Sequence, residues 1–432
     1  MIILDNALRK RAEEGRPIRV GMVGAGFMGQ PIARRLFQQV EGIDLVCIAN
    51  RTPERAAEAL RLAGVDDPVR VDTVEALEAA IAAGRPAYTG DAHVLCAADG
   101  IDLVLEVTGA IENGAKVVLD AIEHGKHTLL MNAELDGTVG PLLKAKADAA
   151  GLLYGNVDGD QPGVIMNLHR FVEGIGCTPK LLGNIKGLQD PYRNPTTQEG
   201  FAKQWGQNPY MVTSFADGTK VNFEMAIVAN NTGFTAAKRG LWQPVVESGA
   251  PIEDIANSFP VDEILAGDGY VDYCVGASPG PGVFVLATND DPMHQHYLNL
   301  YKLGEGPLYC FYTPYHLCHF EVHNSIVRMV DFADVPVVPI GGPVVEVVAV
   351  AKTDIAAGDT IDGLGGYLTY GESENHPTAR AEGLLPIAMA EGAKATRNIA
   401  KDAAITFDDV ELPPQLINDL FDEQLKHFGD GS

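Results

Sequence analysis

Short apolar runs and amphipathic stretches alternate along the first 160 residues of this chain. The apolar runs are typical of buried strands, and the amphipathic stretches are typical of helices. The pattern predicts strands at 18–23, 44–49, 103–107, 128–131 and 152–155. It predicts helices at 4–15, from 27 onward, and at 53–63, 74–83, 113–123 and 140–150. This alternation predicts a doubly wound, mostly parallel sheet with right-handed connections, which is a Rossmann domain over residues 1–160.

The pattern changes after residue 160. Aromatic residues, prolines and short alternating segments at 211–215, 220–226 and 282–287 predict a mixed sheet with covering helices. We interpret residues 161–340 as an α+β domain that supplies substrate contacts and a dimer interface. Residues 341–432 are expected to form a third, small β-rich domain, with strands at 344–352, within 355–361 and at 384–392, and a helix at 416–428. The fold class is therefore α/β, with a Rossmann domain followed by two further domains.

The glycine sequence Gly24-x-Gly26-x-x-Gly29 separates the first predicted strand from the helix that follows it. In a dinucleotide-binding turn, the first glycine allows a tight turn, the second lets a diphosphate approach the backbone, and the third lets helix and strand pack closely. Backbone N–H groups and the positive helix end then hold the phosphates. The alternative is an ordinary strand–helix turn. The residues expected to bind the diphosphate are Gly24, Ala25, Gly26, Phe27, Met28 and Gly29.

The second predicted strand ends at Asn50, Arg51 and Thr52. An NAD-binding domain usually carries an acidic residue at this place, where it binds the ribose hydroxyls. A neutral Asn50 does not repel a 2′-phosphate, and the Arg51 guanidinium can bind one through two parallel hydrogen bonds. These residues therefore favour NADP(H), with NAD(H) as the alternative. The other interpretation of Arg51 is a solvated residue that caps the following helix.

Composition restricts the partners of the protein. The 432 residues carry a formal net charge of −26, so the surface repels nucleic acid and anionic lipid, and we expect neither as a partner. No apolar run approaches the length of a membrane span, and the N-terminal segment resembles a charged amphipathic helix rather than a signal peptide. The six cysteines are scattered, without a Cys-x-x-Cys pair. These features predict a soluble cytoplasmic protein with reduced cysteines.

Acidic residues follow two successive strands of the predicted sheet. One strand end carries Asn132, Glu134 and Asp136, and the next carries Asp158 and Asp160. Ligands bind beyond the carboxyl ends of parallel strands, where the nicotinamide should also lie. Carboxylate oxygens suit Mg²⁺ or Mn²⁺, so Glu134 and Asp160 are candidate metal ligands. In the other interpretation, Asp136 and Asp158 cap helices or turns.

Further residues are candidates for the reaction itself. Thr108 and Gly109 end another strand of the sheet and are expected to lie against the nicotinamide, while Asn132 would position the substrate. Lys186 could protonate the oxygen of a carbonyl that receives hydride, with Asp190 orienting it. The other interpretation of Lys186 is a surface lysine in a polar loop. Candidate cations for a phosphate or carboxylate of the substrate are Arg193, Lys238 and Arg239.

The segment 315–323 is rich in histidine. If it forms a strand, then His319, Glu321 and His323 share one face and could bind a metal. The chain lacks the Cys-x-x-Cys and His-Glu-x-x-His patterns that are typical of zinc sites. A polar face near a domain boundary is therefore favoured over a metal site.

The glycine turn, the tripeptide Val107-Thr108-Gly109 and residues 127–136 resemble the homoserine-dehydrogenase-like NAD(P)-binding superfamily. Nearly the whole chain resembles the deoxyxylulose-phosphate-reductoisomerase-like (DRL) proteins, which carry a C-terminal SAF domain. The segments that carry this resemblance are 131–136, 223–230, 271–273, 281–285, 306–311, 314–317, 347–352 and 357–359. The resemblance implies an NADP(H)-dependent oxidoreductase or reductoisomerase that uses a divalent metal, and a SAF-like domain over residues 341–432.

Two differences from the DRL pattern bear on the substrate. Gln161 stands where that pattern has glutamate, and the loop 185–191 also differs. The substrate class is therefore a small hydroxylated molecule, such as a keto-sugar phosphate, a polyol or a homoserine-like alcohol, and we expect a homodimer or homotetramer. The competing hypothesis is a nucleotide-responsive sugar-binding or regulatory protein without turnover. The density of ionisable residues at the expected nicotinamide face favours the enzyme.

Overall fold

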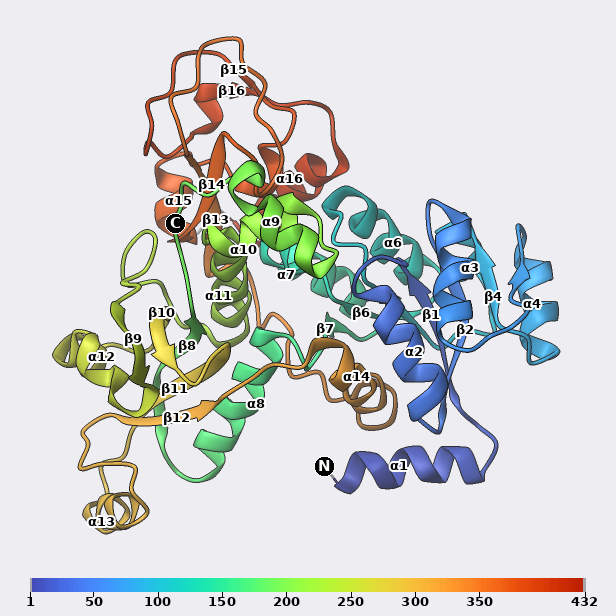
Figure 1. Ribbon diagram of the computed structural model, residues 1–432, viewed down its shortest axis with the longest axis horizontal. Coiled ribbons are helices and arrows are strands. Elements are labelled where there is room, and N and C mark those ends of the chain that lie inside the picture. Colours follow the sequence, from blue (N-terminus) through green and yellow to red (C-terminus); the bar gives the residue numbers. More distant parts are fainter. Residues whose placement is uncertain (1, 430–432) are drawn as a thin grey trace. The chain divides into compact units, whose positions relative to one another are not determined.

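The computed structural model describes residues 2–429. Within this part of the chain, the backbone forms two compact units. The first unit runs to Asp160 and also includes Leu317–Val338, and the second comprises Gln161–His316 and the residues from Pro339 onward. A segment from late in the sequence therefore completes the N-terminal unit, as the orange α14 shows in Figure 1.

The first unit is built on a parallel sheet. Its strands are β1 (Ile18–Val23), β2 (Ile43–Ala49), β3 (Val69–Arg70), β4 (Ala87–Thr89), β5 (Leu103–Glu106), β6 (His127–Leu130) and β7 (Tyr154–Asn156). They lie in the order β3-β4-β2-β1-β5-β6-β7, and each neighbouring pair is parallel. The order reverses beside β1, and ligands of open α/β sheets bind at such a switch point.

Helices cover both faces of this sheet. They are α1 (Ile2–Glu13), α2 (Gly29–Gln39), α3 (Pro53–Leu62), α4 (Val74–Ala82), α5 (Ala92–Cys96), α6 (Ile111–Glu123), α7 (Ala133–Ala149) and α14 (Cys318–Phe332). One core cluster joins Met22 of β1 to α2 and to Ile326 of α14. Another joins Val23 of β1 to Leu95 of α5 and Val117 of α6. Burial on both faces explains why the strands are nearly continuous apolar runs in the sequence.

The second unit begins with α8 (Gln161–Gly174) and contains a mixed sheet. The strand order is β12 (Tyr309–Thr313), β11 (Gly282–Thr288), β8 (Thr178–Lys186), β10 (Tyr270–Ser278) and β9 (Val245–Pro251). Strand β8 is parallel to β10 and antiparallel to β11. The other helices of this region are α9 (Pro195–Trp205), α10 (Pro209–Ala216), α11 (Thr219–Thr232), η1 (Ile252–Ser258), α12 (Val261–Ala266) and α13 (Pro292–Leu300).

The end of the chain adds small antiparallel sheets to the second unit. They pair β13 (Val345–Ala351) with β14 (Thr369–Asn375), and β15 (Lys394–Ala395) with β16 (Val410–Glu411). The helices here are α15 (His376–Ala381), η2 (Ile387–Met389), η3 (Phe407–Asp409) and α16 (Leu416–Phe428). Helix α11 packs against β13 and β14. The side chains of Asn222 and Asn230 accept hydrogen bonds from the N–H groups of Ser373 and Val344, so polar contacts also fasten these strands to α11.

Several predicted strands of the later regions are wrong. Residues 211–215 lie in α10 and residues 220–226 lie in α11. Helix α11 is buried from Val221 to Asn231, so it lacks the one-sided apolar pattern of a surface helix, and its local alternation suggested a strand. The strand expected at 384–392 is replaced by η2 and isolated bridges, whereas the strand at 344–352 and the helix at 416–428 are confirmed.

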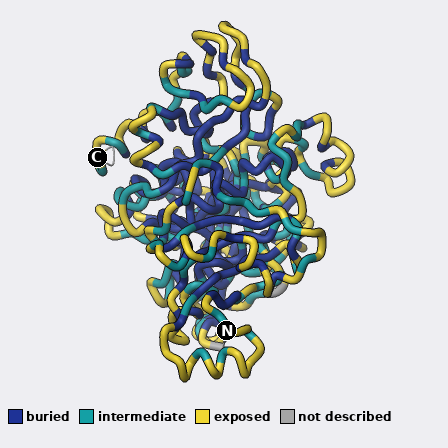
Figure 2. The backbone as a smooth tube through the Cα atoms, turned by 90° about the vertical axis from the view of Figure 1, so that its left-hand side faces the viewer, coloured by how far each residue is buried: buried dark blue, intermediate teal, exposed yellow. Residues whose placement is uncertain are grey.

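Figure 2 colours the backbone by burial; most strands are buried, whereas β9 and the helix α13 are mainly exposed or half-buried. Among residues 2–429, no helix combines the length and the apolar character that crossing a membrane requires. The cysteines are free thiols, and all but Cys318 are buried.

Candidate active site

The glycine turn connects β1 to α2. Gly24 has a φ of +117°, and a Cβ at this position would lie 3.0 Å from the backbone of Val107. A Cβ at Gly29 would collide with the Gly24 carbonyl oxygen, so glycine is required for α2 to begin so close to the turn. A Cβ at Gly26 would meet nothing within 4 Å. The backbone at Gly26 is therefore open to a diphosphate.

The start of α2 has the chemistry of a phosphate site. Its N-cap is Met28, and no side chain caps the helix. Unsatisfied N–H groups and the positive end of the helix dipole attract an anion. Phe27 is exposed, whereas Ala25 is buried and its N–H donates to the Asn50 side chain at 3.2 Å. The turn therefore fits the diphosphate of a dinucleotide, although the Ala25 N–H is already used within the protein.

At the end of β2, the Asn50 carboxamide braces the glycine turn. Its Oδ1 accepts the hydrogen bond from Ala25, and its Nδ2 donates to the Thr52 carbonyl at 2.9 Å. Arg51 is exposed, and no hydrogen bond or ion pair engages its guanidinium within residues 2–429. Thr52 is exposed as the N-cap residue of α3, without a side-chain capping bond. This strand end thus offers a free cation beside a neutral amide.

Sequence reasoning missed a buried carboxylate at the end of β5. Glu106 accepts hydrogen bonds from the Thr108 N–H at 2.8 Å, from the Thr108 hydroxyl, and from Asn132 Nδ2 at 2.9 Å. Burial raises the pKa of Glu106, and these donors oppose the rise. The carboxylate fixes both the turn that contains Gly109 and the start of α7. A lone acid inside the apolar run 103–107 was the signal that could have revealed it.

Helix α7 begins at Ala133, not at residue 140 as predicted, so the acids after β6 do not lie in a loop. Asn132 is the N-cap residue, and its Oδ1 accepts a hydrogen bond from the Leu135 N–H at 3.3 Å. Glu134 and Asp136 lie in the first helical turn and are only 3% and 1% exposed. Because its Oδ1 accepts from Leu135 and its Nδ2 donates to Glu106, the Asn132 side chain fixes the connection between β6 and α7.

Asp136 is part of the interior of the first unit. The Tyr154 hydroxyl donates a hydrogen bond to it at 2.6 Å. Burial raises the pKa of Asp136 to about 6, and its hydrogen bonds to Tyr154 and Asn156 oppose the rise. A Cβ at Gly140 would collide with the Asp136 carboxylate, which explains why a glycine lies within this helix. Asp136 therefore packs inside the domain and does not cap a turn.

The acids beyond β7 have different surroundings. Asp158 is 1% exposed, accepts a hydrogen bond from Arg328 Nη1 at 2.8 Å, and donates its N–H to Ser325 Oγ at 2.7 Å. Burial raises the pKa of Asp158, while the Arg328 charge opposes the rise. Asp160 is partly exposed and accepts a hydrogen bond from the Cys318 thiol at 3.7 Å. Asp158 thus links the end of β7 to α14. Of the two acids, Asp160 is the more accessible.

Residues 318–323 of the histidine-rich segment form the first turns of α14, so the strand on which the metal interpretation depended is not formed. His319 and His323 are one helical turn apart, but Glu321 does not share their face. Val322 is fully buried against the core of the first unit, which sets the helical register. Burial, with the nearby charge of Arg35, lowers the pKa of His323 to about 4, so this imidazole is neutral at physiological pH.

In the second unit, Lys186 is the last residue of β8 and is partly exposed. Within the described residues, no hydrogen bond or ion pair engages its amine. The Asp190 carboxylate instead accepts hydrogen bonds from the Tyr192 N–H at 3.1 Å and Arg193 Nε at 3.0 Å. The predicted pair of Lys186 and Asp190 is therefore not formed, and the lysine amine is available to a ligand.

Two of the other three predicted cations form ion pairs with acids of the second unit. Arg193 binds Asp190, and Arg239 binds Glu374 at 2.8 Å and also Glu382. Lys238 lies near enough to Asp272 to oppose the rise in the pKa of that carboxyl, which burial takes to about 7. The charges of Arg193 and Arg239 are thus largely compensated within the protein.

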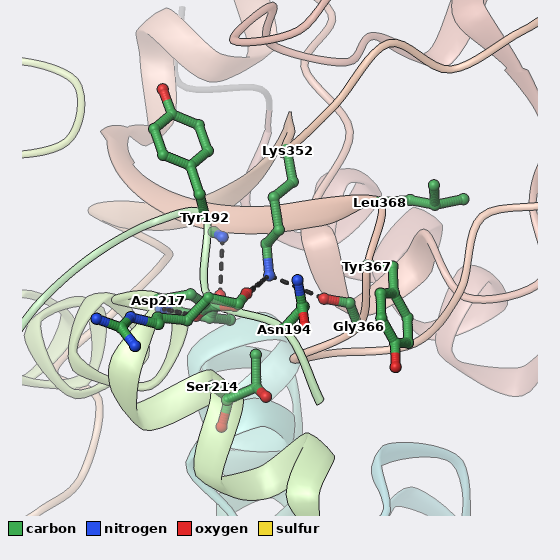
Figure 3. A network of polar contacts seen from close by, with 12 residues as sticks. Tyr192, Asn194, Ser214, Asp217, Lys352, Gly366, Tyr367 and Leu368 are labelled. Carbon is green, nitrogen blue, oxygen red and sulfur yellow. Dashed lines mark hydrogen bonds and ion pairs between the residues drawn. The ribbon is translucent and has the colours of Figure 1, made fainter. Parts of the chain in front are cut away.

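A buried lysine joins the C-terminal segment to the helices of the second unit (Figure 3). Lys352 Nζ donates to Asp217 Oδ2 at 2.9 Å, to the Arg193 carbonyl at 2.7 Å and to the Gly366 carbonyl at 2.9 Å. The other Asp217 oxygen accepts the Thr219 N–H at 2.9 Å. Since each proton of the ammonium group is bound, this network is structural rather than catalytic.

The turn, the strand order and the polar strand ends define the first unit as an NAD(P)-binding domain. Residues 24–151 match the family described as homoserine dehydrogenase, NAD binding domain. Residues 159–322 match the family described as oxidoreductase DRL, catalytic domain. In this chain, a domain that matches the NAD-binding domain of homoserine dehydrogenase therefore precedes a domain that matches the DRL catalytic domain. The resemblance to the homoserine dehydrogenase and DRL families is confirmed over these two ranges, and the SAF-like domain over residues 341–432 stays a prediction.

Similar proteins match over parts of the chain. Inositol 2-dehydrogenase of Burkholderia ambifaria is 29% identical over 109 residues, which are 25% of this chain and 26% of that protein. Inositol 2-dehydrogenase 4 of Saccharopolyspora erythraea is 34% identical over 97 residues, 21% of this chain and 28% of that protein. The chain thus spans about a quarter of the length of these curated relatives. A crystal structure of a probable dehydrogenase from Thermotoga maritima is 14% identical, with 74% of this chain and 91% of that chain covered and a TM-score of 0.41.

Proposed function

We propose that the protein is an NADP(H)-dependent oxidoreductase that acts on a small hydroxylated substrate: a polyol, a keto-sugar phosphate or a homoserine-like alcohol. The observation that carries the proposal is the open backbone at Gly26 beside the free Arg51, in a domain of the homoserine dehydrogenase type. The DRL catalytic domain supports a reduction or reductive rearrangement of such a substrate. The partial similarity to inositol 2-dehydrogenases supports a polyol within this class.

The preference for NADP(H) depends on Arg51. A 2′-phosphate would form charge-assisted hydrogen bonds with this guanidinium, and each such bond is worth about 1.5–3 kcal/mol. Arg51→Asp is therefore expected to weaken NADPH binding by about 10- to 100-fold in a fluorescence titration. NADH binding should change little. Arg61→Asp, an exposed arginine at the other end of α3, is the control and should leave both affinities unchanged. Equal losses for the two coenzymes would contradict the preference.

A bound nicotinamide would supply the hydride for reduction of a substrate carbon, or take it up in the reverse direction. Lys186 donates a proton to the substrate oxygen during reduction and accepts it during oxidation, because its amine has no partner inside the second unit. Thr108 and Gly109 would lie against the nicotinamide, and Glu106 holds this turn in place by accepting the Thr108 N–H. Asn132 acts through the same glutamate, as a positioning residue.

The assay that tests this reaction follows NADPH absorbance with keto-sugar phosphates, polyols and homoserine. Lys186→Ala should abolish turnover yet keep NADPH affinity, since the lysine is proposed to act on the substrate. Lys186→Arg keeps the charge but not the proton-transfer chemistry, and it should also be inactive. NADPH binding without turnover on the whole panel would instead support the nucleotide-responsive binding protein.

A divalent metal is a further part of the proposal. Glu134 and Asp160 offer the carboxylate oxygens that Mg²⁺ or Mn²⁺ prefers, and such a metal would polarise a substrate oxygen. Chelation should then lower turnover, and added Mn²⁺ should restore it in the native protein but not in Glu134→Gln.

We also propose that the C-terminal sheets form a SAF-like domain and that the protein is a homodimer or homotetramer. Sedimentation equilibrium would give the number of subunits.

A further inference from the structure

A second cluster of metal-ligating side chains lies in the first unit, apart from the glycine turn. His93 belongs to α5, Asp120 belongs to α6, and His124 is the C-cap residue of α6. Their ligand atoms all lie within 4.8 Å of one another. The Nδ1 atoms of both imidazoles lie 3.1 Å from the same oxygen, Asp120 Oδ1.

We propose that His93, Asp120 and His124 form a Zn²⁺ site. Imidazole nitrogens and a carboxylate oxygen are ligands that zinc takes, and three protein ligands leave the fourth position to water. Asp120 and His124 are four residues apart and share one face of their helical segment, to which α5 adds His93. The metal would replace the protons through which the imidazoles now contact the carboxylate.

Contacts within and between the two helices fix the backbone that carries these side chains before any metal binds. Asp91 caps α5 by accepting the His93 N–H at 3.0 Å. The Cys96 thiol donates to the Val117 carbonyl at 3.9 Å, which links α5 to α6. In the metal-free protein, His124 Nδ1 also donates to the Asp120 main-chain carbonyl at 2.9 Å, which holds the ring beside Asp120 and would be replaced by zinc bound at this nitrogen. A site that is already ordered loses little conformational entropy on binding, which favours affinity.

The position of the cluster separates it from the chemistry of the nicotinamide. Helix α6 starts just after the Thr108-Gly109 turn and is 13 residues long, which corresponds to about 20 Å. Zinc at its far end would not touch the reacting atoms. Its role would be to join α5 to α6 and to stabilise the first unit, whatever reaction the enzyme catalyses. The proposal therefore does not depend on the proposed function.

The experiment is a calorimetric titration of Zn²⁺ into metal-stripped protein. The double variant His93→Ala/His124→Ala should bind one equivalent of zinc fewer, or bind it with an affinity lower by at least about tenfold. Removal of even an outer-shell partner of a metal causes a loss of this size. Co²⁺ in place of zinc should show visible absorption bands that this variant lacks. His427→Ala, which removes an exposed imidazole outside the cluster, should bind like the native protein.

Asp120→Asn keeps the shape of the side chain but removes its charge, so it should also weaken zinc binding, while the thermal transition of the metal-free first unit stays at the native temperature. NADPH affinity should be the same in all variants, which distinguishes this site from a metal at the reaction centre. The proposal is overturned if the stripped native protein takes up no zinc, or if the double variant binds the same number of equivalents with the same affinity.

Discussion

Gly26 and Gly29 lie three residues apart in the same turn but have opposite surroundings. Open space lies above Gly26, whereas the Gly24 carbonyl occupies the place where a Cβ of residue 29 would lie. Gly29 therefore serves the fold, whereas the space at Gly26 is the place proposed for the diphosphate. The two roles can be separated by adding one methyl group at each position.

Gly29→Ala is expected to destabilise the protein by about 1–3 kcal/mol, because the new methyl group must displace backbone. Gly26→Ala should stay within about 0.5 kcal/mol of the native stability, yet weaken NADPH binding, because its methyl group fills the space that the diphosphate needs. Urea unfolding and a fluorescence titration measure the two effects. Loss of stability in Gly26→Ala, or its unchanged affinity for NADPH, would show that this space is not the phosphate site.

Asp136 should make stability depend on pH. Burial raises its pKa from 3.8 to about 6, so between these pH values the folded protein binds a proton that the unfolded chain does not. The stabilisation is present below the unfolded pKa and is lost as the pH rises through the folded pKa, at a cost of about 3 kcal/mol by neutral pH. Asp136→Asn keeps an acceptor for Tyr154 and should remove most of this cost. Urea unfolding near pH 4 should then give similar values for both proteins, and the variant should be more stable near pH 7. A variant that is less stable near pH 7 would contradict this account.

At the scale of elements, the sequence predicted the strands and turns whose conformation is determined by the local pattern of residues. The strands β1, β2 and β5 were predicted because they are apolar runs between turn residues. The glycine turn was predicted because its glycines lie close together in the sequence, between a strand and a helix. Helix α11 was missed because burial on every side removes the helical period. The start of α7 was missed because Gly137, Gly140 and Pro141 argue against a helix, whereas packing around Asp136 requires one of them.

The candidate site divides in the same way. Roles for the glycines and Arg51 could be predicted from the sequence, because each proposed role depends on a local strand end or turn. The pairing of Asp158 with Arg328 joins residues 170 positions apart, and the link from Asn132 to Glu106 spans 26 positions. No local pattern encodes such contacts, so acids that look alike in the sequence proved to be structural. Only the fold distinguishes Asp158 and Asp136 from the more accessible Asp160.

Helix α14 should be essential to the unit that it completes, although it follows that unit by more than a hundred residues. Ile326 is fully buried in the core that includes α2 and β1, whereas Phe320 on the same helix is 50% exposed. Ile326→Ala is expected to cost about 2–5 kcal/mol, and Phe320→Ala about 0.5 kcal/mol or less. Urea unfolding followed by circular dichroism measures both. Similar costs for the two variants would show that α14 does not pack on the first unit as described.

At the scale of the whole molecule, each unit has its own buried core and its own buried ion pair. In the first unit, Arg328 binds Asp158, and in the second, Lys352 binds Asp217. Separate cores allow separate cooperative transitions, so a single melting temperature would not describe this protein. The cofactor site belongs to the first unit, and bound coenzyme should therefore stabilise that unit selectively.

Scanning calorimetry should resolve two transitions, which two variants assign. Ile326→Ala should lower the transition of the first unit, and Lys352→Met should lower that of the second. The latter leaves the buried Asp217 without its partner, at a cost of about 3–5 kcal/mol. NADPH at about 100 times its dissociation constant should add about 2.7 kcal/mol to the first transition and leave the second unchanged. One transition that moves with both variants and with the coenzyme would instead mean that the units unfold together.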